Sequence, residues 1–360
     1  MSIEAKAVEA VPGAMPEGTD IVLSVRGLKK YYPIESGMLR RVTGHVKAVD
    51  DVSFDLARGE VLALVGESGC GKTTLGRSII RAINPTGGTA TLRIDGEAVD
   101  LAHADRQTLR RLRRHMNMVF QDPFSSLSPR MSVRDIIGEP LRAQGVPAAE
   151  IAKKVEEIAQ MCGLNPAHLS RYPNAFSGGQ RQRVCIARAL VTNPVLIVAD
   201  EPVSALDVSI QAQILNLLQK LQRELNLSFL FVAHDLSVVE HIADRVAVMY
   251  VGKIIELADT EDLYRRPRHP YTEALMSAVP KPDPDRDDET IILGGEVASP
   301  ANPPSGCYFH PRCRYAQEIC KTSAPALRQV DARHWAACHF AEELALSGVG
   351  EIDAQTDGEL

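Results

Sequence analysis

The nonapeptide GESGCGKTT, at residues 66–74, constrains the fold more than any other stretch of the chain. It follows a short apolar run typical of a buried strand, VLALV at 61–65, and precedes a helical pattern over 72–83. A strand, a loop of the form G-x-x-x-x-G-K-[ST] and a helix, in this order, indicate a phosphate-binding loop. Because this arrangement belongs to parallel sheets covered by helices, the sequence predicts an α/β fold.

The residue types of this loop suit phosphate chemistry. Glycines let the backbone curl so that its N–H groups face phosphate oxygens, and the helix N-terminus adds a favourable dipole. Lys72 is expected to reach the β- and γ-phosphates, and the Thr73 hydroxyl to bind Mg²⁺. Cys70 lies inside the loop and is not expected to join a metal site. The candidate nucleotide-binding residues here are Gly66, Glu67, Ser68, Gly69, Cys70, Gly71, Lys72, Thr73 and Thr74.

Further strands and helices alternate along the chain. Apolar runs predict strands at 116–120, 195–199 and 229–233, with helical patterns over 132–143, 148–162, 178–192, 208–225 and 236–244. Buried strands separated by helices predict a mainly parallel sheet. VKAVDDVSFDL, which precedes the first core strand, alternates apolar and polar residues like a half-exposed antiparallel strand. VAVMYVGKIIEL predicts a hairpin that turns at Gly252.

Composition divides the chain into four parts. We expect a disordered tail over 1–20, a large domain over 21–265, a smaller domain over 266–345 and a disordered acidic tail over 346–360. The stretch that begins at Pro267 is rich in proline and charge, which predicts a surface linker. No apolar run is long enough to cross a bilayer, and residues 1–20 lack the pattern of a signal peptide. We therefore expect a chain of the reducing cytosol, where disulfides are disfavoured.

The net charge of −6 gives no general attraction for nucleic acid or anionic lipid. A local arginine cluster, RRLRR at 110–114, is interpreted as a solvated helix face rather than a nucleic-acid patch. No nucleic-acid partner is expected.

Two more motifs accompany the phosphate-binding loop. VLIVADEP delivers Asp200 and Glu201 to the end of a strand, where Asp200 suits contact with Mg²⁺ through water and Glu201 suits a general base. FSGGQRQRVCIARAL places Ser177 before a helix, and the N–H groups of that helix start form a second anion site. Two such sites in one chain make sense if the second serves a nucleotide that another subunit holds.

With these motifs in this order, the chain resembles the ATP-binding-cassette (ABC) ATPases over roughly residues 21–265. Further matches are Gln121 in VFQDP, the D-loop SALD at 204–207, His234 in VAHD and an adenine-stacking aromatic, Tyr32, with Tyr31 as its rival. The resemblance implies a P-loop NTPase core of the ATP-binding-cassette type, α/β in class, with an antiparallel β-subdomain and a helical subdomain over about 122–190. A small cysteine-containing C-terminal domain is expected to follow.

The resemblance also implies roles. Two cassettes bind two ATP molecules head to tail, each between the loop of one subunit and Ser177, Gly178, Gly179 and Gln180 of the other. Glu201 polarises the attacking water, and His234 and Gln121 contact the γ-phosphate, so that these residues and Lys72 form the expected catalytic set. Thr73, Gln121 and Asp200 are the expected Mg²⁺ residues. Asp207 joins the two sites across the interface.

Longer stretches resemble the ATPases of dipeptide and oligopeptide importers, nearest the F-type subunit. They include QDPFSSLSPRMSV, HDLSVVEHIADRVAVMY, RRPRHPYTEALMSAVP and GCYFHPRC. The resemblance implies a related second ATPase in a heterodimer, two membrane permease subunits, an extracytoplasmic solute-binding protein and a peripheral position on the cytoplasmic face of the bacterial inner membrane. Permease docking is expected between 121 and 141. The alternatives are an importer of nickel or another solute, a soluble cassette ATPase outside transport, and a regulatory subunit that scarcely hydrolyses ATP.

Four cysteines near the C-terminus remain open to three interpretations. Cys307, Cys313, Cys320 and Cys338 lack the paired C-x2-4-C spacing of structural zinc sites. Four thiolates suit a [4Fe-4S] cluster, which the resemblance also implies, since some members of the peptide-importer family carry one. Zinc is the alternative cofactor, and reduced cysteines that pack a small domain are the third interpretation. His310, His334 and His339 are candidates to replace one ligand.

Overall fold

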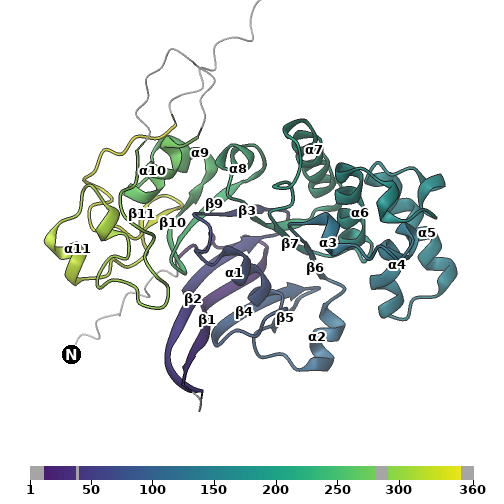
Figure 1. Cartoon of the computed structure of the whole chain (residues 1–360), viewed down its shortest axis with the longest axis horizontal. Coiled ribbons are helices and arrows are strands. Elements are labelled where there is room, and N and C mark those ends of the chain that lie inside the picture. The colour runs from purple at the N-terminus through teal and green to yellow at the C-terminus, as the bar shows by residue number, and fades with distance from the viewer. Residues whose placement is uncertain (1–11, 38–39, 280–290, 350–360) are drawn as a thin grey trace, which may run out of the picture.

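The larger of two sheets forms the core of the molecule (Figure 1). The structure, a computed structural model, describes residues 12–37, 40–279 and 291–349. The strand order of this sheet is β11-β12-β10-β9-β3-β8-β7-β6, and the five strands from β9 to β6 run parallel. Their bounds are β3 (Val61–Val65), β6 (Met116–Val119), β7 (Leu196–Asp200), β8 (Ser228–Val232), β9 (Arg245–Tyr250), β10 (Lys253–Asp259), β11 (Arg328–Asp331) and β12 (His334–Ala336).

The predicted parallel core is confirmed. The four predicted core strands lie within one residue of their observed bounds. Every residue of β3, β7 and β8 is buried, as expected for parallel strands that helices cover on both faces. The hairpin of β9 and β10 turns at Gly252, as predicted.

A second, antiparallel sheet has the order β2-β1-β4-β5. Its strands are β1 (Ile21–Ser36), β2 (Arg41–Ala57), β4 (Gly87–Ile94) and β5 (Glu97–Asp100), with α2 (Arg106–Leu112) following. Helix α1 (Lys72–Ile79) lies between the two sheets (Figure 1). Leu75 of α1 shares a hydrophobic cluster with Phe54 of β2 and Val198 of β7, which fixes the start of α1 against both sheets.

Helices α3 to α6 form a lobe at one end of the molecule (Figure 1). They are α3 (Pro123–Ser126), α4 (Val133–Ala143), α5 (Ala148–Met161) and α6 (Gly178–Leu190), with short 3₁₀ turns η1 (Pro166–His168) and η2 (Pro173–Ala175). Gly138 lets α4 approach α5 closely, because a Cβ there would lie 2.7 Å from Ile151 Cγ2. Helices α7 (Val208–Leu225) and α8 (Leu236–Ile242) follow. None of the helices in the described ranges has both the length and the apolar character of a membrane span.

The C-terminal segment is attached to the core sheet. It comprises α9 (Thr260–Arg265), α10 (Pro270–Ser277), η3 (His310–Arg312), α11 (Glu318–Thr322), β11 and β12. Strand β12 pairs with β10 in antiparallel register, with Glu256 opposite Ala336 and Leu257 opposite Trp335. The segment therefore continues the sheet that carries the phosphate-binding loop, and a separate cysteine-containing domain is not confirmed.

The prediction of a surface linker from Pro267 is wrong over the described residues 267–279. Helix α10 is buried there, and Tyr271 and Thr272 have no exposed surface. Pro270 suits the first turn of a helix, and Nδ1 of His269 accepts the N–H of Tyr271 as a cap. Oε1 of the buried Glu273 carboxylate pairs with Arg314 at 3.0 Å, so a residue type that suggested a surface is paired inside the protein.

The predicted tails are only partly described. Residues 12–20, placed in the N-terminal tail by the sequence, contact the core: the carbonyl of Gly13 accepts hydrogen bonds from Asp55 N and from the buried Arg245 guanidinium. Val349 N donates to the carbonyl of Tyr264. These backbone contacts tie down both described ends, and residues 1–11 and 350–360 lie outside the described residues.

Candidate nucleotide-binding site

The loop at 66–73 joins β3 to α1 in the predicted geometry. Gly66 and Gly71 adopt positive φ angles of 143° and 111°. A Cβ on Gly71 would lie 2.1 Å from the carbonyl oxygen of Ala48, and one on Gly66 would lie 2.2 Å from that of Met249. Only glycine fits these two positions, because both the backbone angles and the neighbouring carbonyls exclude a side chain.

Lys72 is the first residue of α1, and its side chain is hydrogen-bonded to the phosphate-binding loop. Its buried ammonium donates to the carbonyl oxygens of Gly66 at 2.6 Å and Glu67 at 3.0 Å. The thiol of Cys70 lies 3.7 Å from the same nitrogen. Burial raises the pKa of Cys70, which keeps this thiol neutral beside the ammonium. The cation is therefore already positioned within the loop, and a phosphate can exchange for the carbonyl oxygens.

Asp200 meets the start of α1. The hydroxyl of Thr73 donates to Oδ1 of Asp200 at 2.7 Å, and Arg77 lies 3.5 Å from Oδ2. Burial raises the pKa of Asp200. Its Oδ2 atom is buried and accepts no hydrogen bond. A buried hydroxyl–carboxylate pair with one unsatisfied oxygen fits a hydrated Mg²⁺, whose ligands are oxygens and water.

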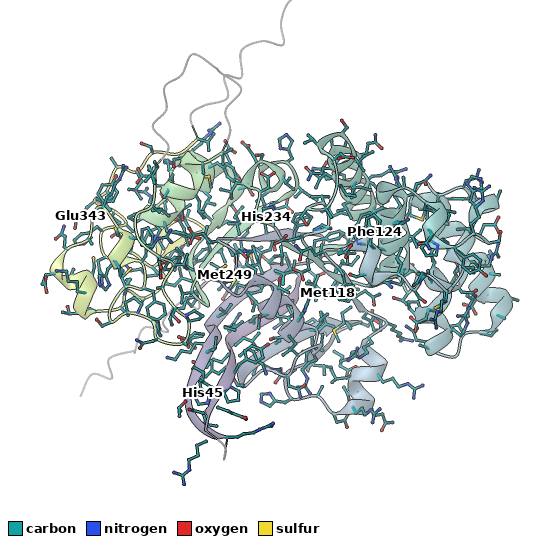
Figure 2. All side chains as sticks on the ribbon, viewed as in Figure 1. His45, Met118, Phe124, His234, Met249 and Glu343 are labelled. Carbon is teal, nitrogen blue, oxygen red and sulfur yellow. The ribbon has the colours of Figure 1, made fainter. Side chains whose placement is uncertain are left out.

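Gln121, Glu201 and His234 converge on one point. They follow β6, β7 and β8 in turn, at the carboxyl edge of the sheet. Oε2 of Glu201 accepts a hydrogen bond from Nε2 of Gln121 at 2.9 Å and lies 3.1 Å from Nδ1 of His234. Glu201 holds a left-handed backbone conformation, with φ of 47°, which is costly for a residue with a side chain. Figure 2 shows His234 near the middle of the molecule.

The two candidate aromatics differ in what they contact. The hydroxyl of Tyr31 donates to the carboxylate of Asp50. The ring of Tyr32 is exposed, with the ammonium of Lys30 4.7 Å from its centroid. Tyr32 suits stacking on a base better than Tyr31, because its ring is exposed and its hydroxyl is not tied to a carboxylate as that of Tyr31 is.

The second anion site is exposed and lies in the helical lobe. Ser177 caps α6 in a capping box: its hydroxyl accepts from Gln180 N at 3.4 Å, and the Gln180 side chain accepts from Ser177 N at 3.0 Å. Gly178 and Gly179 form the first turn. In Figure 1 this helix start lies in a different part of the molecule from α1. Asp207 is also exposed and makes no side-chain cap at α7.

The four C-terminal cysteines come together. Cys307, Cys313, Cys320 and Cys338 line one small cavity together with His310 and His339. Burial raises the pKa of the Cys313 thiol to about 11 and that of Cys338 to about 12. The donor set is of the kind that holds an iron–sulfur cluster. Within the described ranges, however, no three residues of the metal-binding types are arranged to hold a metal ion.

His334, a candidate ligand, is engaged elsewhere. Its Nε2 lies 2.7 Å from Oε1 of Glu256, and both side chains are buried between β12 and β10. This pair fastens the C-terminal strand to the sheet, so His334 is not available as a substitute ligand at the cysteine-lined cavity.

A groove separates the helical lobe from the core. It has a volume of about 990 Å³, and its lining includes Phe120, Glu139 and Pro140 together with the arginines of the 110–114 cluster. Phe124, at the start of the lobe, is 56% exposed, with the guanidinium of Arg181 4.3 Å from its ring (Figure 2). Exposed aromatics beside a groove are typical of a binding surface. Arg111 also pairs with Glu97, as expected for a solvated helix face.

Sequence reasoning missed two residues that contact the phosphate-binding loop. Arg312 forms a two-pronged ion pair with Glu67, and the hydroxyl of Tyr271 accepts the N–H of Glu67 at 2.8 Å. Arg312 lies in GCYFHPRC, a stretch that the sequence marks by its cysteines and by its resemblance to peptide-importer ATPases, neither of which points to the phosphate-binding loop. No local pattern marks a contact across 245 residues.

Comparison with known proteins agrees with this geometry. The ABC transporter family model matches residues 49–204, and the model of the oligopeptide/dipeptide transporter C-terminal region matches 255–320. The oligopeptide transport ATP-binding protein AppF of Bacillus subtilis is 52% identical over 89% of this chain and 98% of its own length. A putative peptide import ATP-binding protein of Brucella ovis is 54% identical over 88% and 97%.

Solved structures show the same core. CbiO1 of Clostridium perfringens superposes with a TM-score of 0.59 at 28% identity, covering 68% of this chain and 91% of its own. The dimeric cassette MJ0796 bound to ADP and phosphate superposes with a TM-score of 0.57 at 28% identity, covering 66% and 98%. The chain belongs to the ABC transporter ATP-binding proteins and carries the C-terminal region of their oligopeptide/dipeptide group.

Proposed function

We propose that this chain is the ATP-hydrolysing subunit that powers import of di- or oligopeptides through separate membrane permeases. The convergence of Gln121, Glu201 and His234 beside the phosphate-binding loop carries the proposal, because it supplies the groups that ATP hydrolysis requires. The similarity to the AppF oligopeptide transport protein supports peptides as the solute class. Import of nickel or another small solute is the alternative.

The proposed chemistry follows from the positions of these groups. Lys72 and the loop N–H groups bind the β- and γ-phosphates. Thr73, Asp200 and Gln121 hold Mg²⁺, which supplies charge neutralisation when bound. Glu201 accepts the proton of the attacking water, and His234 fixes the position of Glu201 and contacts the γ-phosphate. The buried Oδ2 atom of Asp200, which accepts no hydrogen bond, supports the proposed role of Asp200 at Mg²⁺.

We propose that a second, related cassette completes the site. Ser177 and Asp207 are exposed, and helix α6, which Ser177 caps, lies in a different part of the molecule from α1, which supports use on a partner's ATP. The phosphate-binding loop of one chain and the helix start at Ser177 of the other then meet only in a head-to-tail dimer. The MJ0796 cassette, which was solved as a dimer, supports this arrangement. The partner is proposed to be a related chain rather than an identical copy.

Permease subunits are proposed to dock at the groove beside the helical lobe. The groove and the exposed Phe124 lie next to Gln121, so closure around ATP moves the docking surface. The chain would then sit as a peripheral subunit on the cytoplasmic face of the inner membrane. Cysteines engineered between 124 and 140 should crosslink to the permeases, whereas cysteines on the outer face of α7 should not. Absence of crosslinks throughout that window would exclude docking there.

The segment 266–345 is proposed to be a C-terminal domain that supports a cofactor in its cysteine-lined cavity. The proposal of a [4Fe-4S] cluster, with zinc as the alternative, rests on four thiols that line one cavity, although in the described residues no three metal-binding groups are arranged to hold a metal ion. Protein purified without oxygen should contain iron and sulfide in a ratio near unity. Zinc alone would identify the other cofactor. Absence of all three would leave reduced cysteines that pack the segment.

Substitution Glu201→Gln tests the proposed hydrolysis. We expect ATP turnover of the assembled transporter to fall by about 10²–10⁴-fold, the usual contribution of a general base. ATP binding should persist and should trap a cassette dimer in gel filtration. Glu157→Gln, on the exposed face of α5, is the matched control. Unchanged turnover would refute Glu201 as the base and favour a regulatory subunit.

A further inference from the structure

The phosphate-binding loop carries a negative charge of its own. Glu67 is its second residue, and a carboxylate beside the triphosphate would repel ATP. The loop of this chain therefore needs a counter-charge, and the structure shows where it comes from.

That counter-charge is Arg312. Its two terminal nitrogens donate to the two carboxylate oxygens of Glu67 at 2.8 and 3.0 Å. The Arg312 side chain is only 7% exposed, and its Nε has no hydrogen-bond partner. Such a two-pronged pair fixes direction as well as charge, because the planar guanidinium matches both carboxylate oxygens.

Glu67 is held at its backbone as well. Its N–H donates to the hydroxyl of the buried Tyr271, and its carbonyl accepts from Lys72. Tyr271 packs against Tyr250 and Phe309, with ring centroids 4.8 and 5.4 Å away. The C-terminal segment therefore holds Glu67 in two places: Arg312 pairs with its carboxylate, and Tyr271 accepts a hydrogen bond from its backbone N–H. We call these two contacts the clamp.

The arginine of the clamp lies in a turn at residues 307–313, here called the cysteine-bearing turn. Arg312 lies between Cys307 and Cys313, and successive backbone bonds from His310 N to Cys307 O and from Cys313 N to His310 O close the turn. Cys307 N donates to Cys320 O, which joins the turn to α11. The position of Arg312 therefore depends on the walls of the cysteine-lined cavity.

We propose that Arg312 is a positioning residue of the ATP site: it neutralises Glu67, orients the phosphate-binding loop and couples ATP affinity to the state of the cysteine-bearing turn. The inference rests on the proposed role of the loop at 66–73. Arg312 itself contacts Glu67, so its effect is on ATP binding and on loop geometry rather than on the reacting atoms.

Substitution Arg312→Gln tests this in the full chain. We expect the Kd for a fluorescent ATP analogue and the KM for ATP to rise about tenfold, while kcat stays within about twofold. Arg312→Lys keeps the charge without the fork and should raise the KM about threefold. The double variant Arg312→Gln/Glu67→Gln removes both charges and should restore most of the affinity.

Arg328→Gln is the matched control, because Arg328 forms a similar two-pronged pair with Glu342 in the same segment, where it contacts a residue outside the loop. A normal KM for Arg312→Gln, or a double variant as weak as the single one, would overturn the inference. A purely structural role would lower the unfolding temperature and leave the double variant unrescued. Lys72→Ala distinguishes the proposed ATP site from the proposed role of Arg312. If this variant still hydrolysed ATP, the proposed site at 66–73 would be contradicted, whereas a failure of the Arg312 variants alone would contradict only the clamp.

Discussion

The chain completes one half of its nucleotide site and leaves the other half open. In the half around Lys72, Lys72 and Asp200 are buried, and the groups already bind one another: the ammonium on loop carbonyls, Thr73 on Asp200, and Gln121 and His234 on Glu201. The half at Ser177 is exposed and satisfied only by its own capping box. Under the proposed function, ATP affinity belongs to the single chain and hydrolysis to the assembly, and this contrast can be tested.

Lys72→Ala should have the largest effect, because it removes the cation of the completed half. We expect ATP binding by the isolated chain to weaken by more than about 100-fold, since charge-assisted contacts to phosphate are lost in a buried site. Equilibrium titration with a fluorescent nucleotide measures it. Lys220→Ala, on the exposed face of α7, should bind normally. Equal binding by both variants would place the affinity elsewhere.

Tyr32→Ala should have the next largest effect. Loss of stacking on adenine costs about 1–3 kcal/mol per base, so the Kd should rise roughly tenfold or more. Tyr31→Phe serves as the control, because it removes the hydroxyl bonded to Asp50 and keeps a ring. The same titration compares the two. A larger rise in Kd for Tyr31→Phe than for Tyr32→Ala would make Tyr31, rather than Tyr32, the residue that contacts adenine.

Ser177→Ala should separate the two halves. The isolated chain should bind ATP within about twofold of normal, while turnover of the assembled transporter should fall about tenfold. Loss of the cap should also lower the free energy of unfolding by about 1 kcal/mol. Gln180→Ala breaks the box but keeps the hydroxyl, so it is the stability-matched comparison. Weaker ATP binding by isolated Ser177→Ala would show that this residue serves its own chain's nucleotide.

His269→Asn should have the smallest effect on ATP and a distinct effect on acid stability. Burial lowers the pKa of His269 to about 3, so the unfolded state, near 6.5, binds the proton first as the pH falls. The free energy of unfolding therefore falls between pH 6.5 and 3, by about 2 kcal/mol at pH 5 from this residue. Asparagine can still cap Tyr271 and does not titrate.

The measurement is urea unfolding at pH 7 and pH 5. The variant should lose about 2 kcal/mol less than the wild type over that interval. His45→Asn, on an exposed strand end, should follow the wild type. Parallel pH dependence of all three proteins would mean that His269 is already protonated or exposed in the native state.

Sequence alone predicted where the motifs of the half around Lys72 lie in the fold, while the roles of their residues remain predictions. The loop, Asp200 and Glu201 lie in short motifs whose spacing follows directly from strand, turn and helix geometry. The sequence did not predict the attachment of the C-terminal segment. Proline and charge in 267–279 suggested a surface, but Glu273 is buried against Arg314, and Arg312 meets a residue 245 positions away. Such pairings depend on tertiary geometry, which no local pattern encodes.

Strand β12 has a consequence for how the chain is made. During synthesis β10 emerges about eighty residues before its outer neighbour, so the buried run Ile254–Ala258, apolar except for Glu256, is for a time a strand with an open hydrogen-bonding edge. Open edges of this kind pair readily with other chains. Nascent or truncated copies that end before Trp335 should therefore aggregate, and β12 protects newly made protein by covering that edge.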